Sequence, residues 1–384
     1  MKVAIVYPYL ALYRRPVFKC LMTDKDIEYT IISDIKSNTN IKTIDSNELT
    51  YPWKYDKIRW LSVKNIWLGN RFLWQMGLLK KLKSKKYDFV IFLGTITFLS
   101  TWIALFYLKL KKRNVGFWTH GLYGRESFLI RKIRVLFYNL GDVIFTYNNR
   151  SKKLLEFENI LSNKIIPIYN SLDYNFIESI RKSYMEVDIL DFRSKLFKNE
   201  GKILFFIGRL MPSKGLDQIV YSLKELNSKN KVYNFIFIGD GPMRKELNLL
   251  IKKNNLEDKF LFTGSLYDEN IISKYILSSN LCVCPGAIGL TAIHSMSYGV
   301  PVVTNDDYLN HGPEFEAIIP EKTGAFYLKD NCQSLIDTII HMTEDIDSNY
   351  VRLNCLQMVK NYYNPSVQAN LISMRVIQQI KHNL

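Results

Sequence analysis

The chain has 384 residues, which exceeds the size of one small domain and predicts two or three domains with sizeable cores. It carries 52 Lys and Arg residues against 36 Asp and Glu residues, a formal charge of +16, and 47% of its residues are hydrophobic. This composition excludes a disulfide-rich miniprotein, a lone binding module and a wholly disordered chain.

The excess positive charge lies in the N-terminal half of the sequence. Residues 1–180 hold 29 basic and 14 acidic residues, net +15, whereas residues 181–384 have a net charge of +1. Such an asymmetry is typical of a half that faces nucleic acid, an anionic membrane surface or a phosphorylated ligand. A basic face that is merely solvated explains the charge equally well.

The cysteines and the N-terminal segment indicate a cytoplasmic protein. The five cysteines are scattered without a C-x-x-C pair, so neither a disulfide framework nor a zinc site is indicated. The first apolar stretch is interrupted by Pro8 and followed by Arg14 and Arg15, which leaves it too short for a secretory signal.

Short β-branched or aromatic runs alternate with amphipathic stretches in the first half. We expect strands at Val3–Tyr7, Ile27–Ile32, Phe89–Leu93, Val115–Thr119 and Val143–Tyr147. The uncharged stretch Phe89–Leu108 is long enough to span a bilayer. Gly94 and the threonines after it favour a strand, a turn and then a helix over residues 96–110 instead.

The same alternation returns in the second half. Strands are expected at Ile203–Ile207, Phe235–Ile238, Phe260–Phe262 and Leu281–Cys284, and two helices over residues 350–363 and 365–380 close the chain. This order predicts an α/β fold with two Rossmann-like domains, each a parallel sheet covered by helices. A polar, exposed connection over residues 181–201 places the domain boundary at 180/181.

Ligands of open parallel sheets bind at the carboxyl ends of the strands, so candidate site residues are sought there. The strand ending at Ile207 is followed by Gly208, Arg209 and, five residues later, Lys214. Two cations at this spacing can grip a diphosphate from both sides, although they can also be ordinary exposed residues of a loop.

Two other loops at this edge carry candidate residues. Gly286 and Gly289 precede a helix that runs to about Tyr298, and the free backbone amides of that helix start favour an anion. In the first half, His120 follows the strand Val115–Thr119, where it can contact a sugar hydroxyl or a phosphate, or assist a proton transfer.

Several motifs now appear in one order, and this order resembles family 4 of the retaining glycosyltransferases. The motifs are Gly208-Arg209 with Lys214-Gly215, Gly239-Asp240-Gly241-Pro242, Phe262-Thr263-Gly264, Gly289-Leu290 with Ser297-Tyr298-Gly299, and Thr323-Gly324. The first half adds Tyr13-Arg14-Arg15-Pro16, Thr119-His120-Gly121 and Asn170-Ser171-Leu172-Asp173. The resemblance implies a GT-B fold, with an acceptor-side domain over residues 1–180 and 364–384 and a donor domain over residues 181–363.

The resemblance also implies roles for individual residues. Arg209 and Lys214 would hold the donor diphosphate after Gly208, and His120 would contact the transferred sugar. Residues Gly264 to Leu266 would border the base, and Arg14 and Arg15 would lie on the acceptor side. Further donor contacts are expected from Gly289, Leu290, Thr291, His294, Glu314 and Glu316.

The sequence departs from the family at two positions. The family carries two glutamates eight residues apart around the Gly-Leu pair, and this chain has Gly286 and His294 there. Counting back from Thr323-Gly324 places Glu316 on the family's later donor-loop glutamate, and Glu314 lies two residues earlier. Either acid can supply the missing carboxylate.

We therefore expect a hexosyltransferase-type enzyme that uses a nucleotide-sugar and neither a cofactor nor a metal. Its acceptor is expected to be an oligosaccharide or a polyprenyl-linked saccharide in bacterial surface polysaccharide assembly, as in capsule or O-antigen. A peripheral contact with the inner face of the cell membrane is expected from the basic, aromatic segment that contains Trp53, Trp60, Trp67 and Trp74.

Three alternatives remain open at this point. A degenerate, noncatalytic homologue would explain the two replaced glutamates. A nucleic-acid-binding protein would explain the basic half, but it leaves the motif order unexplained, so no nucleic acid is expected. A dinucleotide-dependent oxidoreductase ranks last, because the first strand is not followed by a GxGxxG fingerprint.

Overall fold

The computed structural model describes residues 1–37, 42–44, 59–69, 71–229 and 231–382. The chain divides into two compact units, unit 1 with Met1–Ser171 and Asn364–Leu384, and unit 2 with Leu172–Tyr363. Helix α7 (Tyr174–Ser183) lies after this division because it packs against α11 (Glu269–Leu277) and α12 (Leu290–Ser297) of unit 2.

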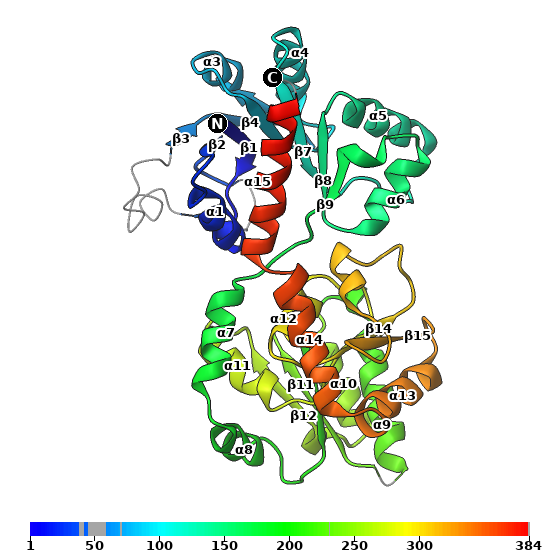
Figure 1. The fold of residues 1–384 in the computed structure, drawn as a ribbon. Helices are drawn as coiled ribbons and strands as arrows, with labels where there is room; N and C mark the ends of the chain where they lie inside the picture. The colour runs from blue at the N-terminus through cyan, green and yellow to red at the C-terminus, as the bar shows by residue number, and fades with distance from the viewer. Residues whose placement is uncertain (38–41, 45–58, 70, 230, 383–384) are drawn as a thin grey trace. The chain divides into compact units, whose positions relative to one another are not determined.

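Unit 1 is built on a seven-stranded parallel sheet (Figure 1). Its strands, in spatial order, are β3 (Arg59–Ser62), β2 (Glu28–Asp34), β1 (Lys2–Tyr9), β6 (Phe89–Leu93), β7 (Asn114–Thr119), β8 (Val143–Thr146) and β9 (Ile165–Pro167). The five strands expected from the sequence of this half are confirmed. Strands β3 and β9 were not expected, since they are short edge strands and β9 ends in a proline.

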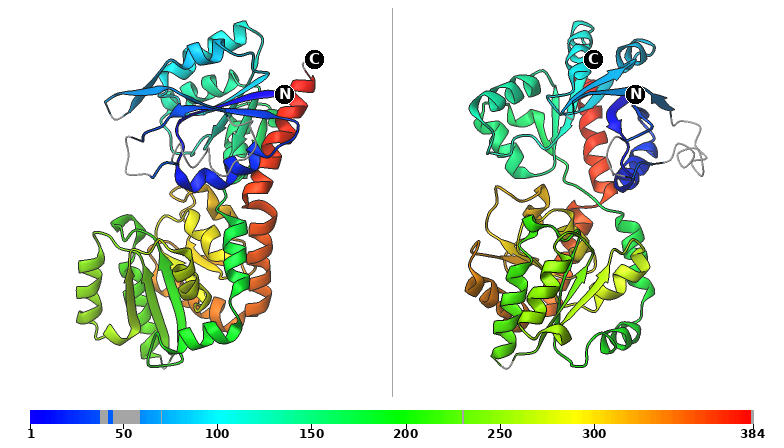
Figure 2. Two further views of the ribbon diagram at one scale, coloured as in Figure 1. Left: turned by 90° about the vertical axis from the view of Figure 1, so that its left-hand side faces the viewer. Right: turned by 180° about the vertical axis from the view of Figure 1, so that it is seen from behind.

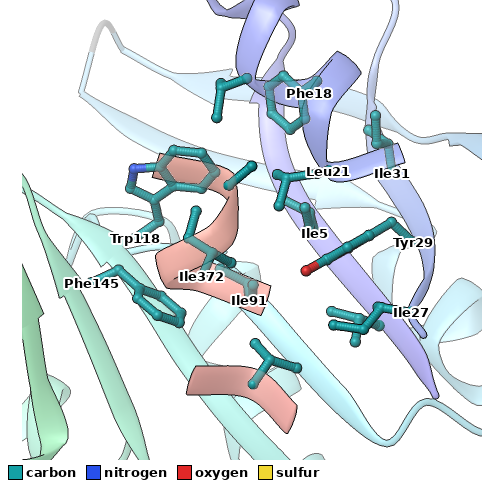
Figure 3. Close-up of a cluster of buried hydrophobic side chains, with 14 of the residues drawn as sticks. Ile5, Phe18, Leu21, Ile27, Tyr29, Ile31, Ile91, Trp118, Phe145 and Ile372 are labelled. Carbon is teal, nitrogen blue, oxygen red and sulfur yellow. The ribbon is translucent and has the colours of Figure 1, made fainter. Parts of the chain in front are cut away.

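Helices cover both faces of this sheet. One face packs against α1 (Arg15–Met22) and α15 (Pro365–His382), which contribute Phe18, Leu21 and Ile372 to a fully buried cluster (Figure 3). The other face packs against α3 (Leu78–Lys83), α4 (Leu99–Leu110) and α5 (Phe128–Asn139). Helix α6 (Asn149–Phe157) contacts β8 and β9. Figure 2 shows α15 beside α1 from two further directions.

An antiparallel hairpin of β4 (Lys64–Leu68) and β5 (Phe72–Met76) lies beside this sheet and was not expected from the sequence. One face of the hairpin points inward, where the Gln75 amide donates to the Tyr7 carbonyl at 2.9 Å. The opposite face, here called the outer hairpin face, consists of the exposed Lys64 and five apolar side chains that are 37–54% exposed, namely Ile66, Leu68, Phe72, Trp74 and Met76.

The tryptophans expected to form a membrane-facing segment do not share one surface. Trp53 lies outside the described residues. Trp60 is half-buried in β3, and Trp67 packs edge-to-face on Phe98 with ring centroids 6.1 Å apart. Trp74 is exposed on the outer hairpin face.

None of the helices in the described part of the chain is long and apolar enough to cross a membrane. The stretch Phe89–Leu108 forms β6 and most of α4, as the turn at Gly94 predicted.

Unit 2 contains a six-stranded parallel sheet, which confirms the predicted α/β class with two parallel-sheet domains. The spatial order is β12 (Phe260–Gly264), β11 (Tyr233–Ile238), β10 (Lys202–Ile207), β13 (Leu281–Cys284), β14 (Val302–Asn305) and β15 (Gly324–Tyr327). Besides α7, α11 and α12, its helices are α8 (Glu186–Ser194), α9 (Asp217–Ser228), α10 (Arg244–Lys253), α13 (Cys332–Ile340) and α14 (Ser348–Tyr362).

The polar connection expected over residues 181–201 is wrong in part, because this segment contains α8. None of the α8 side chains is fully buried, which explains the polar sequence. The helix is nevertheless anchored to unit 2, since the Arg193 guanidinium donates to the carbonyls of Gly201 and Ser278 and to the Asn280 side chain.

Candidate functional site

The carboxyl edge of the unit 2 sheet is closed by loops that approach one another at glycines. Gly208 follows β10 with a φ of +142°, and its amide donates to the Ile238 carbonyl at 3.0 Å. Gly239 has a φ of +148°, and a Cβ atom there would lie 2.0 Å from the Gly208 carbonyl oxygen. Only glycine therefore permits the two strand ends to approach this closely.

The loop after β10 also interlocks with the loop after β13. A Cβ atom on Gly286 would lie 2.1 Å from the Ser213 carbonyl oxygen and 2.5 Å from the Lys214 Cα. The Lys214 ammonium donates to the Ala287 carbonyl. Position 286 therefore has no room for the glutamate of the family, because the backbone that carries Lys214 occupies that space.

Helix α12 begins directly after these loops, at Leu290. The Thr291 hydroxyl donates to the Ile207 carbonyl at 3.1 Å, which ties the first turn of the helix to the end of β10. The Glu314 side chain is only 3% exposed, and its Oε2 atom lies 3.7 Å from where a Cβ of Gly289 would be. A carboxylate is thus placed beside the positive end of the α12 dipole.

The position of the Glu314 carboxylate also distinguishes Glu314 from Glu316, the two acids that the sequence left as alternatives. Glu314 is the one beside Gly289, whereas Glu316 is half-buried further along the turn Pro313–Ala317. His311 holds this region in place, because its Nδ1 accepts from the Ile288 amide at 3.1 Å and its Nε2 faces the Asn305 carbonyl at 2.8 Å. This pairing places the proton of a neutral imidazole on Nε2.

His294 holds a glutamate from another helix. Its Nε2 lies 2.6 Å from the Glu269 carboxylate, which also accepts the Tyr298 hydroxyl at 2.6 Å. Burial raises the pKa of Glu269, but the hydrogen bonds from His294 and Tyr298 outweigh it and bring the pKa below its usual value. A carboxylate is therefore present beside position 294, although α11 supplies it.

The residues expected to border the base lie at a different part of the edge. Gly264, with a φ of +73°, ends β12, and β11 and β10 separate that strand from β13. Leu266 is half-buried just after it. The adjacent Arg244 guanidinium lies 2.9 Å from the Asp240 carboxylate and 5.5 Å from the centroid of the Phe262 ring.

Of the site residues expected in the second half, the structure brings one group together at a single edge. This group contains Gly208, Lys214, Gly289, Leu290, Thr291 and Glu314. Arg209 belongs to the same loop as Lys214, and its side chain is exposed. His294 is one turn further along α12, and Gly264 and Leu266 are at β12.

In unit 1, Arg14 is buried among aromatic rings at the carboxyl ends of β1, β7 and β8. The guanidinium is 9% exposed, donates to the Tyr147 hydroxyl and lies 5.2–5.8 Å from the ring centroids of Tyr7, Tyr13, Trp118 and Tyr147. Cation–π attraction therefore stabilises a charge that is largely removed from water. Arg15, the other residue expected on the acceptor side, is half-buried at the start of α1.

His120 lies beside this arginine cluster. Its ring centroid is 4.6 Å from that of Tyr147 and 5.9 Å from that of Tyr123. Desolvation by the surrounding protein, together with the Arg14 and Arg134 cations, lowers the pKa of His120 to about 4, although the residue retains an exposed surface. The imidazole is therefore neutral at pH 7, and it can accept a proton or a hydrogen bond.

Sequence reasoning missed Glu269 and the aromatic residues around Arg14. Glu269 lies 25 residues before His294 in the chain, and no local motif links the two positions. Tyr147 ends an expected strand, so its place at the carboxyl edge was a signal that could have identified it. Trp118 was expected inside a strand, where side-chain orientation is not evident from the sequence alone.

Comparison with known proteins relates unit 2 to one family. Residues 188–353 match the family described as glycosyl transferases group 1. A 2-deoxystreptamine glucosyltransferase from Streptomyces kanamyceticus is 29% identical over 120 residues, which are 30% of this chain and 31% of the relative. An uncharacterised glycosyltransferase from Methanocaldococcus jannaschii is 26% identical over 220 residues, 56% of this chain and 51% of the relative. The matched segments thus span about a third to a half of these relatives.

Solved structures resemble the whole chain. The lipopolysaccharide outer core galactosyltransferase WaaB has a TM-score of 0.69 at 13% identity, with 99% of this chain and 100% of that chain covered. A glycosyltransferase from Rickettsia africae has a TM-score of 0.72 at 17% identity, with 100% of this chain and 99% of that chain covered. Anabaena HepE, solved with UDP, has a TM-score of 0.69 at 16% identity, with 98% of this chain and 100% of that chain covered. At these identities the likeness establishes the GT-B fold.

Proposed function

We propose that this chain, with its glycosyl transferases group 1 domain at residues 188–353, is a hexosyltransferase-type enzyme that moves a sugar from a nucleotide-sugar to a saccharide. The observation that carries the proposal is the interlocked pair of loops after β10 and β13. They bring the Lys214 ammonium and the start of α12 to one sheet edge, with Arg209 in the same loop. Such an edge can stabilise the charge that develops on a departing diphosphate.

The proposed reaction retains the configuration of the sugar and uses no metal or cofactor. The bond between the anomeric carbon and the donor phosphate oxygen breaks, and a bond from that carbon to the acceptor oxygen forms. The departing phosphate oxygen takes the acceptor proton. Arg209 and Lys214 balance the negative charge of the leaving nucleotide, and neutral His120 holds a hydroxyl of the transferred sugar.

The solved relatives suggest which substrates to test first. Anabaena HepE was solved with UDP-glucose, so a uridine diphosphate sugar is the first donor to examine. WaaB acts in the lipopolysaccharide outer core, which supports a lipid-linked saccharide as acceptor. We place the reaction in bacterial surface polysaccharide assembly, at the inner face of the cell membrane, with the basic unit 1 in peripheral contact with anionic lipid.

Thermal unfolding in the presence of nucleotides tests the donor site without any acceptor. A ligand at a hundred times its Kd stabilises the folded state by about 2.7 kcal/mol, so one nucleoside diphosphate or its sugar should raise the Tm selectively. Arg209→Ala and Lys214→Ala should each remove most of this shift, because each deletes one cation. Lys224→Ala, an exposed cation on α9, is the matched control and should keep the full shift.

Two outcomes would contradict the proposal. One is the absence of a shift with any nucleotide at millimolar concentration. The other is an equal shift in Arg209→Ala, Lys214→Ala and wild type. Tight, salt-dependent binding of oligonucleotides that survives Arg209→Ala would favour a nucleic-acid-binding protein instead.

A second candidate, a noncatalytic homologue that still binds a nucleotide-sugar, is favoured by one observation. Position 286 has no room for a side chain, and position 294 carries a histidine in place of an acid. An assay for release of the nucleoside diphosphate separates the two candidates. Its substrate is the nucleotide-sugar that raises the Tm. Slow release that increases with added saccharide supports the enzyme, and no release under any condition supports the noncatalytic homologue.

A further inference from the structure

Unit 1 contains a cavity of its own. It has a volume of about 350 Å³ and lies at the carboxyl ends of β6 and β7, against α5 and the turn of the β4–β5 hairpin. Every residue that lines it belongs to unit 1. The polar side chains of its lining come from Arg71, Thr95, Thr97, Thr119, His120 and Arg134.

The charge of this lining is positive. Arg71 and Arg134 both line the cavity, and the lining residues include no Asp or Glu. Glu126 lies 3.9 Å from one Arg134 nitrogen, but its carboxylate also receives the amides of Tyr123 and Gly124 at 2.6 and 2.9 Å. Arg71 is exposed in the hairpin turn, with its guanidinium 6.0 Å from the Phe72 ring. A net positive lining therefore remains.

Two nitrogens on lining residues are buried without an acceptor. Arg134 Nε and Trp118 Nε1 each lack a hydrogen-bond partner among the described residues. Arg14 adds a third cation behind the Trp118 ring, at 5.4 Å from its centroid, and its Nη1 also lacks a partner among those residues. Trp118 is neutral, but the Arg134 and Arg14 cations have charge that their protein acceptors do not fully balance. An anionic group in the cavity would be attracted to that charge without a direct hydrogen bond to these buried nitrogens.

The cavity also offers surfaces that fit a sugar ring. Tyr123 presents an exposed aromatic ring, and the Arg134 guanidinium lies 5.1 Å from its centroid, whereas the ring of Trp118 is fully buried. The exposed imidazole of His120 lies at the same edge, whereas the buried Thr119 hydroxyl is already hydrogen-bonded to the Gly94 carbonyl and the Tyr138 hydroxyl. Threonine hydroxyls can donate to and accept from sugar hydroxyls, whereas the two arginines can only donate. Neutral hydroxyls alone would leave the arginine charges without a counterion.

We propose that this cavity binds a saccharide that bears a phosphate or carboxylate group, with Arg71 and Arg134 contacting the anionic group. The inference deepens the proposed function, because it makes this anionic saccharide the class of acceptor. Arg71 approaches from the hairpin and Arg134 from α5, so the anionic group is held from two sides. Arginine matches both phosphate and carboxylate in a bidentate manner.

Ligand-observed NMR on the full chain tests this with three probes, glucose 6-phosphate, glucuronate and glucose. At least one anionic probe should bind at least ten times more tightly than glucose. Arg71→Gln and Arg134→Gln should each weaken it about tenfold, the usual effect of losing a charge-assisted hydrogen bond. Lys80→Gln, which removes an exposed cation of α3 away from the cavity, should bind as wild type does.

The two anionic probes distinguish phosphate from carboxylate recognition. Glucose binding as tightly as both of them would overturn the proposal, as would wild-type affinity in both arginine variants. Inorganic phosphate that binds as tightly as glucose 6-phosphate would overturn the saccharide part. Arg71 is exposed, so Arg71→Gln is expected to fold even where loss of the Arg134 bond to the Gly121 carbonyl destabilises unit 1.

The nucleotide-dependent Tm shift of the same samples keeps this test separate from the proposed function. Both arginine variants should retain the shift given by the nucleoside diphosphate itself, because Arg209 and Lys214, the cations proposed to hold the diphosphate, belong to unit 2. A shift without anionic saccharide binding would overturn this inference and leave the glycosyltransferase proposal intact. Anionic saccharide binding without any nucleotide-dependent shift would contradict the glycosyltransferase proposal and would leave the anionic saccharide site of unit 1 intact.

Discussion

At the residue scale, backbone packing explains the most evident departure from the family. The sequence shows that Gly286 replaces a glutamate, and this alone suggested that a functional carboxylate had been lost. The structure shows that a Cβ at this position would lie 2.1 Å from a backbone oxygen. The glycine is therefore part of the way that the two loops interlock.

Gly286→Ala should destabilise the protein by about 1–3 kcal/mol, because the Ser213 and Lys214 backbone must move to admit a methyl group. Urea unfolding followed by circular dichroism measures the change. Gly289→Ala is the matched control, since its Cβ would meet only the Glu314 carboxylate, at an ordinary 3.7 Å. Equal stability of the two variants would contradict the packing explanation.

His120 should remain neutral far below the usual pKa of histidine. Its pKa is lowered to about 4, so between pH 6.5 and pH 4 the unfolded chain binds a proton that the folded chain does not. His120 therefore lowers the free energy of unfolding as the pH falls through that range. The variant His120→Gln should lose less stability over the same range. An NMR titration that shows the His120 ring protonating near pH 6.5 would contradict this.

At the element scale, the hairpin is an exposed apolar feature that the sequence did not predict. Its strands are five residues long, and the alternation of exposed and buried side chains is regular. Apart from Lys64, the outward residues are apolar instead of polar, so the pattern lacked the polar face that usually identifies a surface hairpin. A cluster of exposed apolar residues marks a contact surface.

The outer hairpin face should contribute to binding of anionic lipid vesicles. Leu68→Ser with Trp74→Ser should weaken binding to vesicles that contain phosphatidylglycerol by about tenfold, because each substitution removes buried apolar area at the interface. Co-sedimentation measures the binding. Phe106→Ser with Leu110→Ser on the exposed side of α4 is the control pair, and an equal loss in both pairs would show that no particular surface is responsible.

The strands of both sheets show what a single sequence can predict. Buried parallel strands are continuous apolar runs, and all nine that the sequence indicated are present. Short edge strands such as β9 carry too little of this signal. The motif loops after β10 and β13 were located correctly, but their mutual contact was not, because it joins Ser213 to Gly286 across the sheet edge. The link between His294 and Glu269 was missed for the same reason.

At the scale of the whole molecule, the two units differ sharply in charge. Unit 1 holds 31 basic and 12 acidic residues, a formal charge of +19, whereas unit 2 holds 21 and 24, a charge of −3. An extended anionic partner, such as a charged lipid surface, is therefore to be sought at unit 1. In unit 2 the candidate site has two cations in one loop, Arg209 and Lys214, in an otherwise nearly balanced domain.

The return of α15 to unit 1 has a consequence for the order in which the chain folds during synthesis. Unit 2 is one continuous segment, so it can fold as soon as residue 363 has left the ribosome. The core of unit 1 needs Ile372, Val376 and Ile380 from α15, which are translated after the whole of unit 2. The first unit to be translated is therefore the last to be completed, and until then it exposes the apolar surface that α15 later covers.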